Sequence, residues 1–345
     1  IFGRGDGSFV LNGPTGTVTA TSSGDFNGDG KLDLIYVASS VDKLAIMLGR
    51  SDGSFDPPRT FDVDRAPSAV RSGDFDGDGK LDVAVTCYDT NLVSLLLGKG
   101  DGTFATQRTF SVGRGPNSLA VLDLDADGKL DIVTANVDAD SVSVLIGNGT
   151  GNFAVNKDYS TGKGPVSVAA ADLSGDGRPD VVTANADANT VSYLQGSAVT
   201  AGALNVAKSL SVGQSPADVA VSDVNGDGKL DVVTVNSDSN NLAALVGRGD
   251  GTFVSARYST TCEFPTDFAA GELTGDGKVD LVVRCAAGKR SQALIGQGDG
   301  SFVSSPRAFP LGTAVLITDV NADSKSDLLF FDSGQPLQVL LNSRK

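Results

Sequence analysis

A nine-residue acidic segment recurs seven times along the chain. The first copy is Asp25-Phe-Asn-Gly-Asp-Gly-Lys-Leu-Asp33, and the later copies begin at Asp74, Asp123, Asp172, Asp223, Glu272 and Asp319. Side-chain oxygens occupy positions 1, 3, 5 and 9 of the segment, a backbone carbonyl is available at position 7, and glycine at position 6 permits a sharp turn. Hard oxygen donors of this kind suit Ca²⁺, which takes about six to eight oxygen ligands. Transition metals would favour His or Cys instead.

We therefore predict up to seven Ca²⁺ ions, one in each acidic segment. Two segments have a hydroxyl side chain at position 3, and the last has serine in place of glycine at position 6. The predicted ligands at positions 1, 3, 5, 7 and 9, with position 7 contributing its backbone carbonyl, are Asp25, Asn27, Asp29, Lys31, Asp33, Asp74, Asp76, Asp78, Lys80, Asp82, Asp123, Asp125, Asp127, Lys129, Asp131, Asp172, Ser174, Asp176, Arg178, Asp180, Asp223, Asn225, Asp227, Lys229, Asp231, Glu272, Thr274, Asp276, Lys278, Asp280, Asp319, Asn321, Asp323, Lys325 and Asp327.

The composition argues against several function classes. The chain has 345 residues, a formal net charge of −15, three Cys, and no His or Trp. More than half of the 42 acidic residues lie in the predicted metal segments, so the charge mostly reflects these segments. We find no basic patch for nucleic acid and no apolar run that would insert into a membrane.

Enzyme chemistry is not expected either, because the absence of His removes the commonest general base and any Ser-His-Asp triad. A polysaccharide lyase-like or dehydratase-like enzyme remains as an alternative, with Lys, Tyr or Arg as the base. The residues that break the repeat in the sixth unit would mark such a site, and they are Glu263, Arg284, Lys289 and Arg290.

The acidic segments return about every 49 residues, and each unit contains four strand-like stretches. In the third unit these are residues 118–124, 130–135 and 141–146, and a fourth stretch that ends near Tyr159. Short strands, glycine-rich turns and this period predict an all-β, seven-bladed β-propeller with four-stranded blades, as a single domain over residues 1–345. The N-terminal segment matches a fourth strand and the chain ends on a third strand, so we expect the N-terminal strand to complete the last blade and close the ring.

The acidic segment, followed by a β-rich run such as Leu-Asp-Val-Val-Thr, resembles the FG-GAP or VCBS-type repeats of integrin α-subunit propellers. In place of the family's Gly-Ala-Pro, this chain has Thr134–Asn136, Thr183–Asn185 and related triplets. The resemblance covers all seven units and implies a propeller with its metals on one face. The chain is also similar in blade number and loop type to the Psathyrella-type fungal lectin.

Polar residues recur on the opposite face, in the loops between second and third strands and in the links between blades. Clefts of this kind suit polar ligands, so a glycan or a protein partner is expected there. The alternative is that the Asn and Asp side chains only shape turns and the prolines stiffen the links. The candidate ligand-binding residues are Asn136, Asp138, Asn185, Asp187, Asn236, Asp238, Arg114 and Lys163.

Two cysteines of the sixth unit are placed to form a disulfide. Cys285 ends a second strand, and Cys262 lies in the link that leads into the neighbouring antiparallel strand. Cys87 has no such partner and is expected to be a small buried residue. A disulfide and calcium together indicate a secreted or cell-surface protein. The expected function is a calcium-stabilised extracellular recognition or adhesion module, with a lectin, a lyase-like enzyme or a passive structural domain as alternatives.

Overall fold

The computed structural model describes residues 2–3, 8–10, 18–154, 157–287, 290–309, 314–320, 325–331 and 338–340. Six four-stranded antiparallel sheets follow one another along this chain, each with its strands in sequence order. Their strands are β3 (Val18–Gly24), β4 (Asp33–Ala38), β5 (Lys43–Met47), β6 (Arg59–Asp62); β7 (Pro67–Gly73), β8 (Asp82–Cys87), β9 (Leu92–Leu96), β10 (Arg108–Ser111); β11 (Pro116–Leu122), β12 (Asp131–Asn136), β13 (Ser141–Leu145), β14 (Lys157–Ser160); β15 (Pro165–Ala171), β16 (Asp180–Asn185), β17 (Thr190–Leu194), β18 (Lys208–Ser211); β19 (Pro216–Ser222), β20 (Asp231–Asn236), β21 (Asn241–Leu245), β22 (Arg257–Thr260); and β23 (Pro265–Gly271), β24 (Asp280–Cys285), β25 (Arg290–Gly296), β26 (Phe302–Phe309).

A further sheet contains strands from both ends of the chain, in the order β1-β2-β29-β28-β27. Its strands are β1 (Phe2–Gly3), β2 (Ser8–Val10), β27 (Ala314–Thr318), β28 (Asp327–Phe331) and β29 (Gln338–Leu340). Two 3-10 turns, η1 (Tyr88–Thr90) and η2 (Val137–Ala139), follow β8 and β12. None of the described helices is long and apolar enough to cross a membrane.

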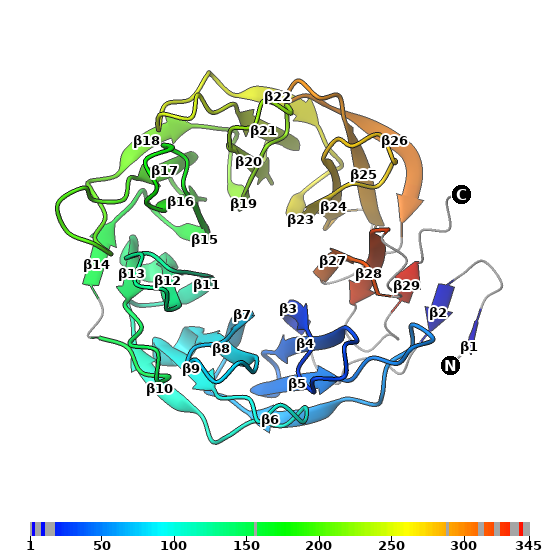
Figure 1. Cartoon of the computed structure of the whole chain (residues 1–345). Helices are drawn as coiled ribbons and strands as arrows, with labels where there is room; N and C mark the ends of the chain where they lie inside the picture. Colours follow the sequence, from blue (N-terminus) through cyan, green and yellow to red (C-terminus); the bar gives the residue numbers. More distant parts are fainter. Residues whose placement is uncertain are drawn as a thin grey trace.

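The sheets stand around a central opening, with the first strand of each sheet nearest to it (Figure 1). This arrangement confirms the prediction of an all-β, propeller-like protein. Its packing explains why the second strands are buried along their whole length: all six residues of β12 are buried. Val133 and Ala135 pack against the following sheet, whereas Ile132 packs against the preceding sheet. Alternate residues of a strand point to opposite faces of the sheet. A sheet that packs between two neighbouring sheets therefore needs apolar residues on both of its faces.

Candidate metal loops, the opposite face and the central channel

Each of the first six acidic segments forms a tight loop between the first and second strands of its sheet. In the first loop the Asp25 carboxylate accepts hydrogen bonds of 2.8 Å from the amides of Gly28 and Gly30. Gly30 has a φ of +77°, a conformation that L side chains adopt at a cost, which explains glycine at position 6. The position-1 carboxylate therefore fixes the turn that brings the other acidic side chains together.

The position-9 aspartate has a structural role that the sequence did not reveal. Asp131 is fully buried, and its two carboxylate oxygens accept hydrogen bonds of 2.7 Å from the amides of Leu124 and Gly147. A Cβ atom on Gly147 would lie 2.2 Å from the Leu130 carbonyl oxygen, so only glycine fits there. The same pair of bonds, from position 2 and from the hairpin glycine, is made by Asp33, Asp82, Asp180, Asp231 and Asp280.

Neighbouring sheets hold the loops in place. The Gly151 amide, in the hairpin after β13, donates a 3.0 Å hydrogen bond to the carbonyl oxygen of Phe75 in the loop of the preceding sheet. The Phe75 ring packs edge-on against Phe153 of that hairpin, with centroids 5.9 Å apart. The position-2 side chain is therefore an anchor between sheets, and the loop geometry depends on the ring of sheets being assembled.

The donor set of the loops fits a hard cation. Carboxylate oxygens of Asp74, Asp76 and Asp78 lie within 4.8 Å of one another. In the third loop the same holds for Asp123, Asp125 and Asp131. Burial, together with the carboxylates of Asp125 and Asp123, raises the pKa of Asp131 to about 6. A bound cation would relieve this crowding of negative charge.

The other predicted ligands take several positions. Lys129 at position 7 pairs with Asp127 at position 5 at 2.6 Å, and its backbone carbonyl is the group assigned to the metal. The same pairing joins Lys31 to Asp29, Lys80 to Asp78, Arg178 to Asp176 and Lys278 to Asp276. Asn321 and Asp323 lie outside the described residues.

The two hydroxyl side chains at position 3 bond within their own loops. Thr274 Oγ1 donates to Asp276 at 2.9 Å, and Ser174 Oγ lies 3.5 Å from Asp172. Both hydroxyls therefore face the carboxylates that the sequence assigned to the metal, as a ligand at that position would.

On the opposite face, three of the predicted ligand-binding residues are structural. Asn136, Asn185 and Asn236 are fully buried. The Asn136 amide nitrogen donates to Ser143 Oγ at 2.8 Å, and its oxygen accepts from Thr134 Oγ1 at 2.9 Å. The structure does not support a ligand-binding role for these three amides, because bonds within their own sheets already use them.

The remaining candidates on this face are exposed: Asp138, Asp187, Asp238, Arg114 and Lys163. Arg114 donates a 3.0 Å bond to the Asp138 carbonyl, which ties a link to the loop of the same sheet. Tyr88, in the preceding sheet, donates its hydroxyl to the Asp138 carboxylate at 3.1 Å. Aromatic and charged groups of adjacent sheets therefore meet at one point of this face.

The link before β23 differs from the others. Cys262 and Cys285 form a disulfide, while Cys87 is free and buried. Phe264 follows two residues after Cys262, has a φ of +51° and is 50% exposed. Phe264 was not among the residues predicted to bind a ligand. Its signal in the sequence is that the equivalent position is Gly115 or Gly164 in other units.

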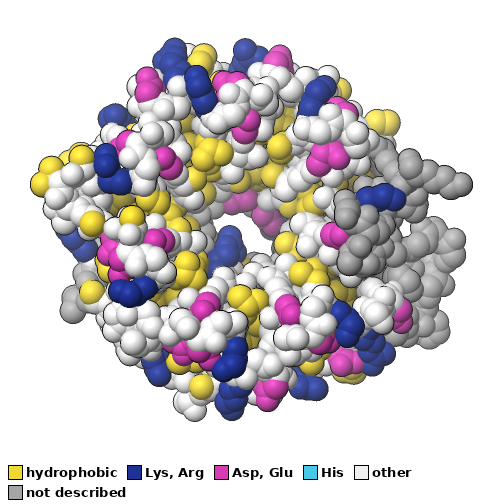
Figure 2. Space-filling view, viewed as in Figure 1, with side chains coloured by type: hydrophobic (Ala, Val, Ile, Leu, Met, Phe, Trp, Pro, Cys, Tyr) yellow, Lys and Arg dark blue, Asp and Glu magenta, His cyan; other side chains and the backbone are white. Residues whose placement is uncertain are grey.

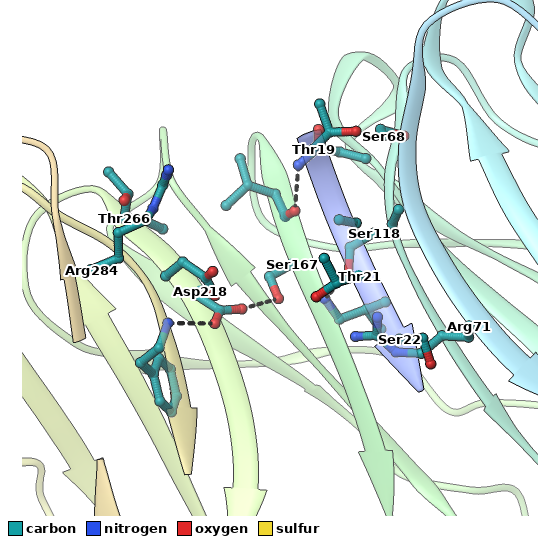
Figure 3. A pocket seen from close by; sticks show the side chains of 18 of the residues that line it. Thr19, Thr21, Ser22, Ser68, Arg71, Ser118, Ser167, Asp218, Thr266 and Arg284 are labelled. Carbon is teal, nitrogen blue, oxygen red and sulfur yellow. Dashed lines mark hydrogen bonds between the residues drawn. The ribbon is translucent and has the colours of Figure 1, made fainter. Parts of the chain in front are cut away.

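The central opening contains a cavity of about 710 Å³, lined mainly by first strands. Figure 3 shows hydroxyl side chains around it, together with Arg71, Asp218 and Arg284. Acidic and basic side chains are both visible inside the opening in Figure 2. Arg71, Asp218 and Asp267 were missed by the sequence analysis. Their only signal was a departure from the small residues at equivalent positions of other units.

The acidic wall of this cavity comes from two adjacent sheets. Asp218 on β19 accepts a 2.7 Å hydrogen bond from Ser167 Oγ. The Asp218 side chain is half-buried and faces the channel. Loss of hydration by the surrounding protein and the nearby Asp267 carboxylate raise the pKa of Asp218 to about 8. Burial also raises the pKa of Asp267, against the opposing influence of Arg284, its register partner on β24. One proton shared by the two carboxyls at neutral pH accounts for these directions.

The model of the FG-GAP-like repeat matches residues 25–85, 74–134, 123–183 and 223–283. The chain belongs to the FG-GAP-like repeat family. Each match begins at position 1 of an acidic segment and extends into the next one, so the loops described above are the part of the sequence that defines the family here. No curated protein is similar to this FG-GAP-like repeat protein in sequence.

Several solved structures are similar to this FG-GAP-like repeat protein in fold. BBS1N in complex with ARL6DN is 14% identical with a TM-score of 0.67, and the match covers 98% of this chain and 97% of that one. A putative 6-phosphogluconolactonase from Bacteroides fragilis is 16% identical with a TM-score of 0.66, over 85% and 84% of the two chains. A catalytically inactive virginiamycin B lyase from Staphylococcus aureus with quinupristin is 12% identical with a TM-score of 0.62, over 96% and 97%. At these identities the likeness shows the fold alone.

These neighbours correct one expectation from the sequence. The absence of His led to the prediction that the protein is not an enzyme, with a lyase-like enzyme kept as an alternative, yet the structural neighbours of this FG-GAP-like repeat protein include a putative lactonase and a lyase. The exclusion was wrong because it treated one residue type as necessary for chemistry on this fold, and function resides in the site rather than in the fold. The neighbours assign no activity to this chain.

Proposed function

We propose that this FG-GAP-like repeat protein is a calcium-stabilised, seven-bladed propeller that works outside the cell and binds a protein partner on the face opposite the acidic loops. Residues 1–345 form one domain in this proposal. The pairing of β2 with β29 supports a seventh blade completed by the N-terminal strand. The disulfide between Cys262 and Cys285 supports an oxidising compartment.

Calcium would occupy up to seven acidic loops, one ion in each. The support is chemical: the loops bring together carboxylate, amide and hydroxyl oxygens, and the pKa of the buried Asp82 is raised to about 6 by burial and nearby carboxylates. Bound Ca²⁺ would supply the positive charge that these groups lack. The chain's own contribution is to hold the oxygens in tight turns.

Phe264 is the observation that supports a binding face most directly. A bulky residue at positive φ is strained, and such strain persists where the surrounding structure enforces it, often at functional sites. Here the Phe264 amide donates to Asn240 Oδ1 at 2.7 Å, and its carbonyl accepts from the Ala286 amide at 2.9 Å. The backbone is thus held while half of the side chain stays in water. An exposed aromatic on a rigid support is typical of the anchors that dominate protein interfaces.

Protein rather than glycan is the favoured partner. BBS1N, which has the same fold, is described in complex with the protein ARL6DN. Sugar sites usually include an aromatic platform beside polar groups, and the hydrogen-bonded pair of Tyr88 and Asp138 is the nearest equivalent here. A glycan therefore remains the other outcome of the test.

The test compares binding by the wild-type protein and two variants in millimolar calcium. Phe264→Ala removes the proposed anchor. Tyr258→Ala is the matched control, because Tyr258 is 54% exposed on the outer strand β22. In one assay each protein is immobilised, and extracellular proteins that bind it are captured by cross-linking. In a second assay each soluble protein is applied to a glycan array.

We expect a defined protein to be captured by the wild type and by Tyr258→Ala, and its affinity to fall about tenfold or more in Phe264→Ala, as for an interface hot spot. Equal capture by all three proteins would reject Phe264 as the anchor. Binding to glycans alone would replace the protein-partner proposal with the lectin alternative.

A further inference from the structure

The central channel combines a large cavity with charges that are not paired across it. Four charged side chains line the cavity in the described part of the chain: Arg71 on β7, Asp218 on β19, Asp267 on β23 and Arg284 on β24. The rest of the polar lining consists mainly of Ser and Thr hydroxyls, including Thr21, Ser22, Ser68, Ser118, Ser167 and Thr266. Such a cavity suits a small, strongly polar ligand.

Arg71 is the unbalanced charge. It comes from the second sheet, across the ring from β19 and β23 (Figures 1 and 3). Its guanidinium donates a 2.8 Å bond to the carbonyl of Val70 and forms no salt bridge within 4.0 Å to any residue that the structure describes. The side chain is exposed to the channel. A guanidinium has five donors in a planar fork, so most of them remain available to a carboxylate.

The opposite wall carries little net negative charge. Asp267 and Arg284 are register partners on adjacent strands, and Arg284 offsets the single negative charge that Asp218 and Asp267 share at neutral pH. The charges of Asp218, Asp267 and Arg284 therefore sum to about zero, and the positive charge of Arg71 dominates the cavity. The lining therefore favours an anion over a cation or a zwitterion.

The rest of the lining favours hydroxyl groups on that anion. Ser and Thr hydroxyls both donate and accept hydrogen bonds, and a carboxyl pair with one proton does the same. Ser167 already bonds to Asp218, so a ligand hydroxyl would join an existing network. The other six first strands have Ala, Ser or Leu at the Arg71 position, which places the charge on one side only.

From this arrangement we propose that the central channel binds a small hydroxylated carboxylate, of the sugar-acid class, with its carboxylate on Arg71 and its hydroxyls on Asp218, Asp267 and the serine and threonine side chains. The residues proposed to hold this ligand include neither Phe264 nor any acidic loop residue. Failure of one proposal therefore leaves the other untouched.

Isothermal titration calorimetry with glucuronate tests the proposal on the full chain in calcium at neutral pH. Glucose is the neutral control and acetate is the carboxylate without hydroxyls. We expect glucuronate to bind with at least about tenfold higher affinity than either control, because only glucuronate satisfies both Arg71 and the hydroxyl lining. Equal heats from acetate would reduce the site to a simple anion site, and no heat from glucuronate would overturn the proposal.

Two variants and a control locate the binding. Arg71→Gln should weaken glucuronate binding by about tenfold or more, whereas Arg59→Gln, on the outer strand β6, should not change it. Arg71→Met, which also removes the charge, serves if Arg71→Gln does not fold. Unchanged affinity in a folded Arg71 variant would contradict the assignment.

The pH profile separates this site from non-specific anion binding. Asp218 faces Asp267, Arg284 and, across the channel, Arg71, and the other groups around it that the structure describes are uncharged. Loss of its proton adds a negative charge, so affinity should fall as the pH rises through about 8. Asp218→Asn should remove this decline and retain binding at high pH. The same decline in Asp218→Asn would show that the carboxyl pair is not involved.

Discussion

The carboxylate of Asp131 and the amide of Gly147 are joined by a hydrogen bond of 2.7 Å, across the base of the third acidic loop. The bond links the end of the loop to the hairpin between β13 and β14. The other carboxylate oxygen of Asp131 accepts a hydrogen bond from the Leu124 amide. The side chain that would bind a metal therefore also joins the start of the loop to its end. The same carboxylate therefore contributes to the fold and to the proposed metal site, and stability has to be measured with and without metal to separate the two contributions.

Replacing Asp131 by Asn should destabilise the protein even without metal. The amide group would place a donor against one of the two backbone amides and leave a buried donor unpaired, at a cost of about 1–3 kcal/mol. Asp127→Asn is the control, since Asp127 forms an exposed pair with Lys129 and should cost less than about 1 kcal/mol. Urea unfolding in excess chelator measures both. Equal losses would argue against the structural role of position 9.

Calcium removal should lower the stability of the wild-type protein. An ion that binds only the folded state contributes about 2.7 kcal/mol per site at a concentration one hundredfold above its dissociation constant. We expect the thermal unfolding temperature to rise with added CaCl₂ and to respond less to MgCl₂, which demands a tighter octahedron. Unfolding at the same temperature in calcium and in chelator would reject the calcium proposal.

The metal-free protein should lose stability as the pH rises. The pKa of Asp82 and of Asp131 is about 6 in the folded chain, above the ordinary value of 3.8. The folded state therefore holds these protons more tightly than the unfolded state between those limits, and stability falls from about pH 4 towards pH 7. Urea midpoints in chelator over this range measure the effect. Calcium should reverse the trend, because it binds the ionised carboxylates.

The disulfide should contribute measurably to stability. Cys262 and Cys285 are 23 residues apart, and closing a loop of this size stabilises a fold by about 3 kcal/mol in the chain-entropy model. The double variant Cys262→Ser/Cys285→Ala should unfold at lower urea concentration than the wild type. Cys87→Ala tests the buried thiol alone, and reducing agent should affect the wild type but not the double variant. No difference between wild type and double variant would contradict the prediction.

The sequence predicted the all-β propeller-like fold and the acidic loops well, because each is repeated. The local requirements of each unit are glycine at position 6, carboxylates at fixed spacing and an apolar run in the second strand. They recur independently in several units. Repetition likewise marked Cys285 as the residue of a second strand that faces the link containing Cys262.

Other features depended on tertiary structure. Asn136 and Asp138 have similar polarity and lie two residues apart, yet one is buried in its sheet and the other is exposed, because β12 ends at Asn136 and Asp138 lies in the 3-10 turn that follows it. Two sheets lie between those of Arg71 and Asp218 in sequence, and the two residues line one cavity only because the first strands surround a common opening. Local sequence determines the turns and strands of each unit. The arrangement of the sheets around the opening determines which side chains meet at the centre. Contacts between units that are distant in sequence form only when the sheets assemble.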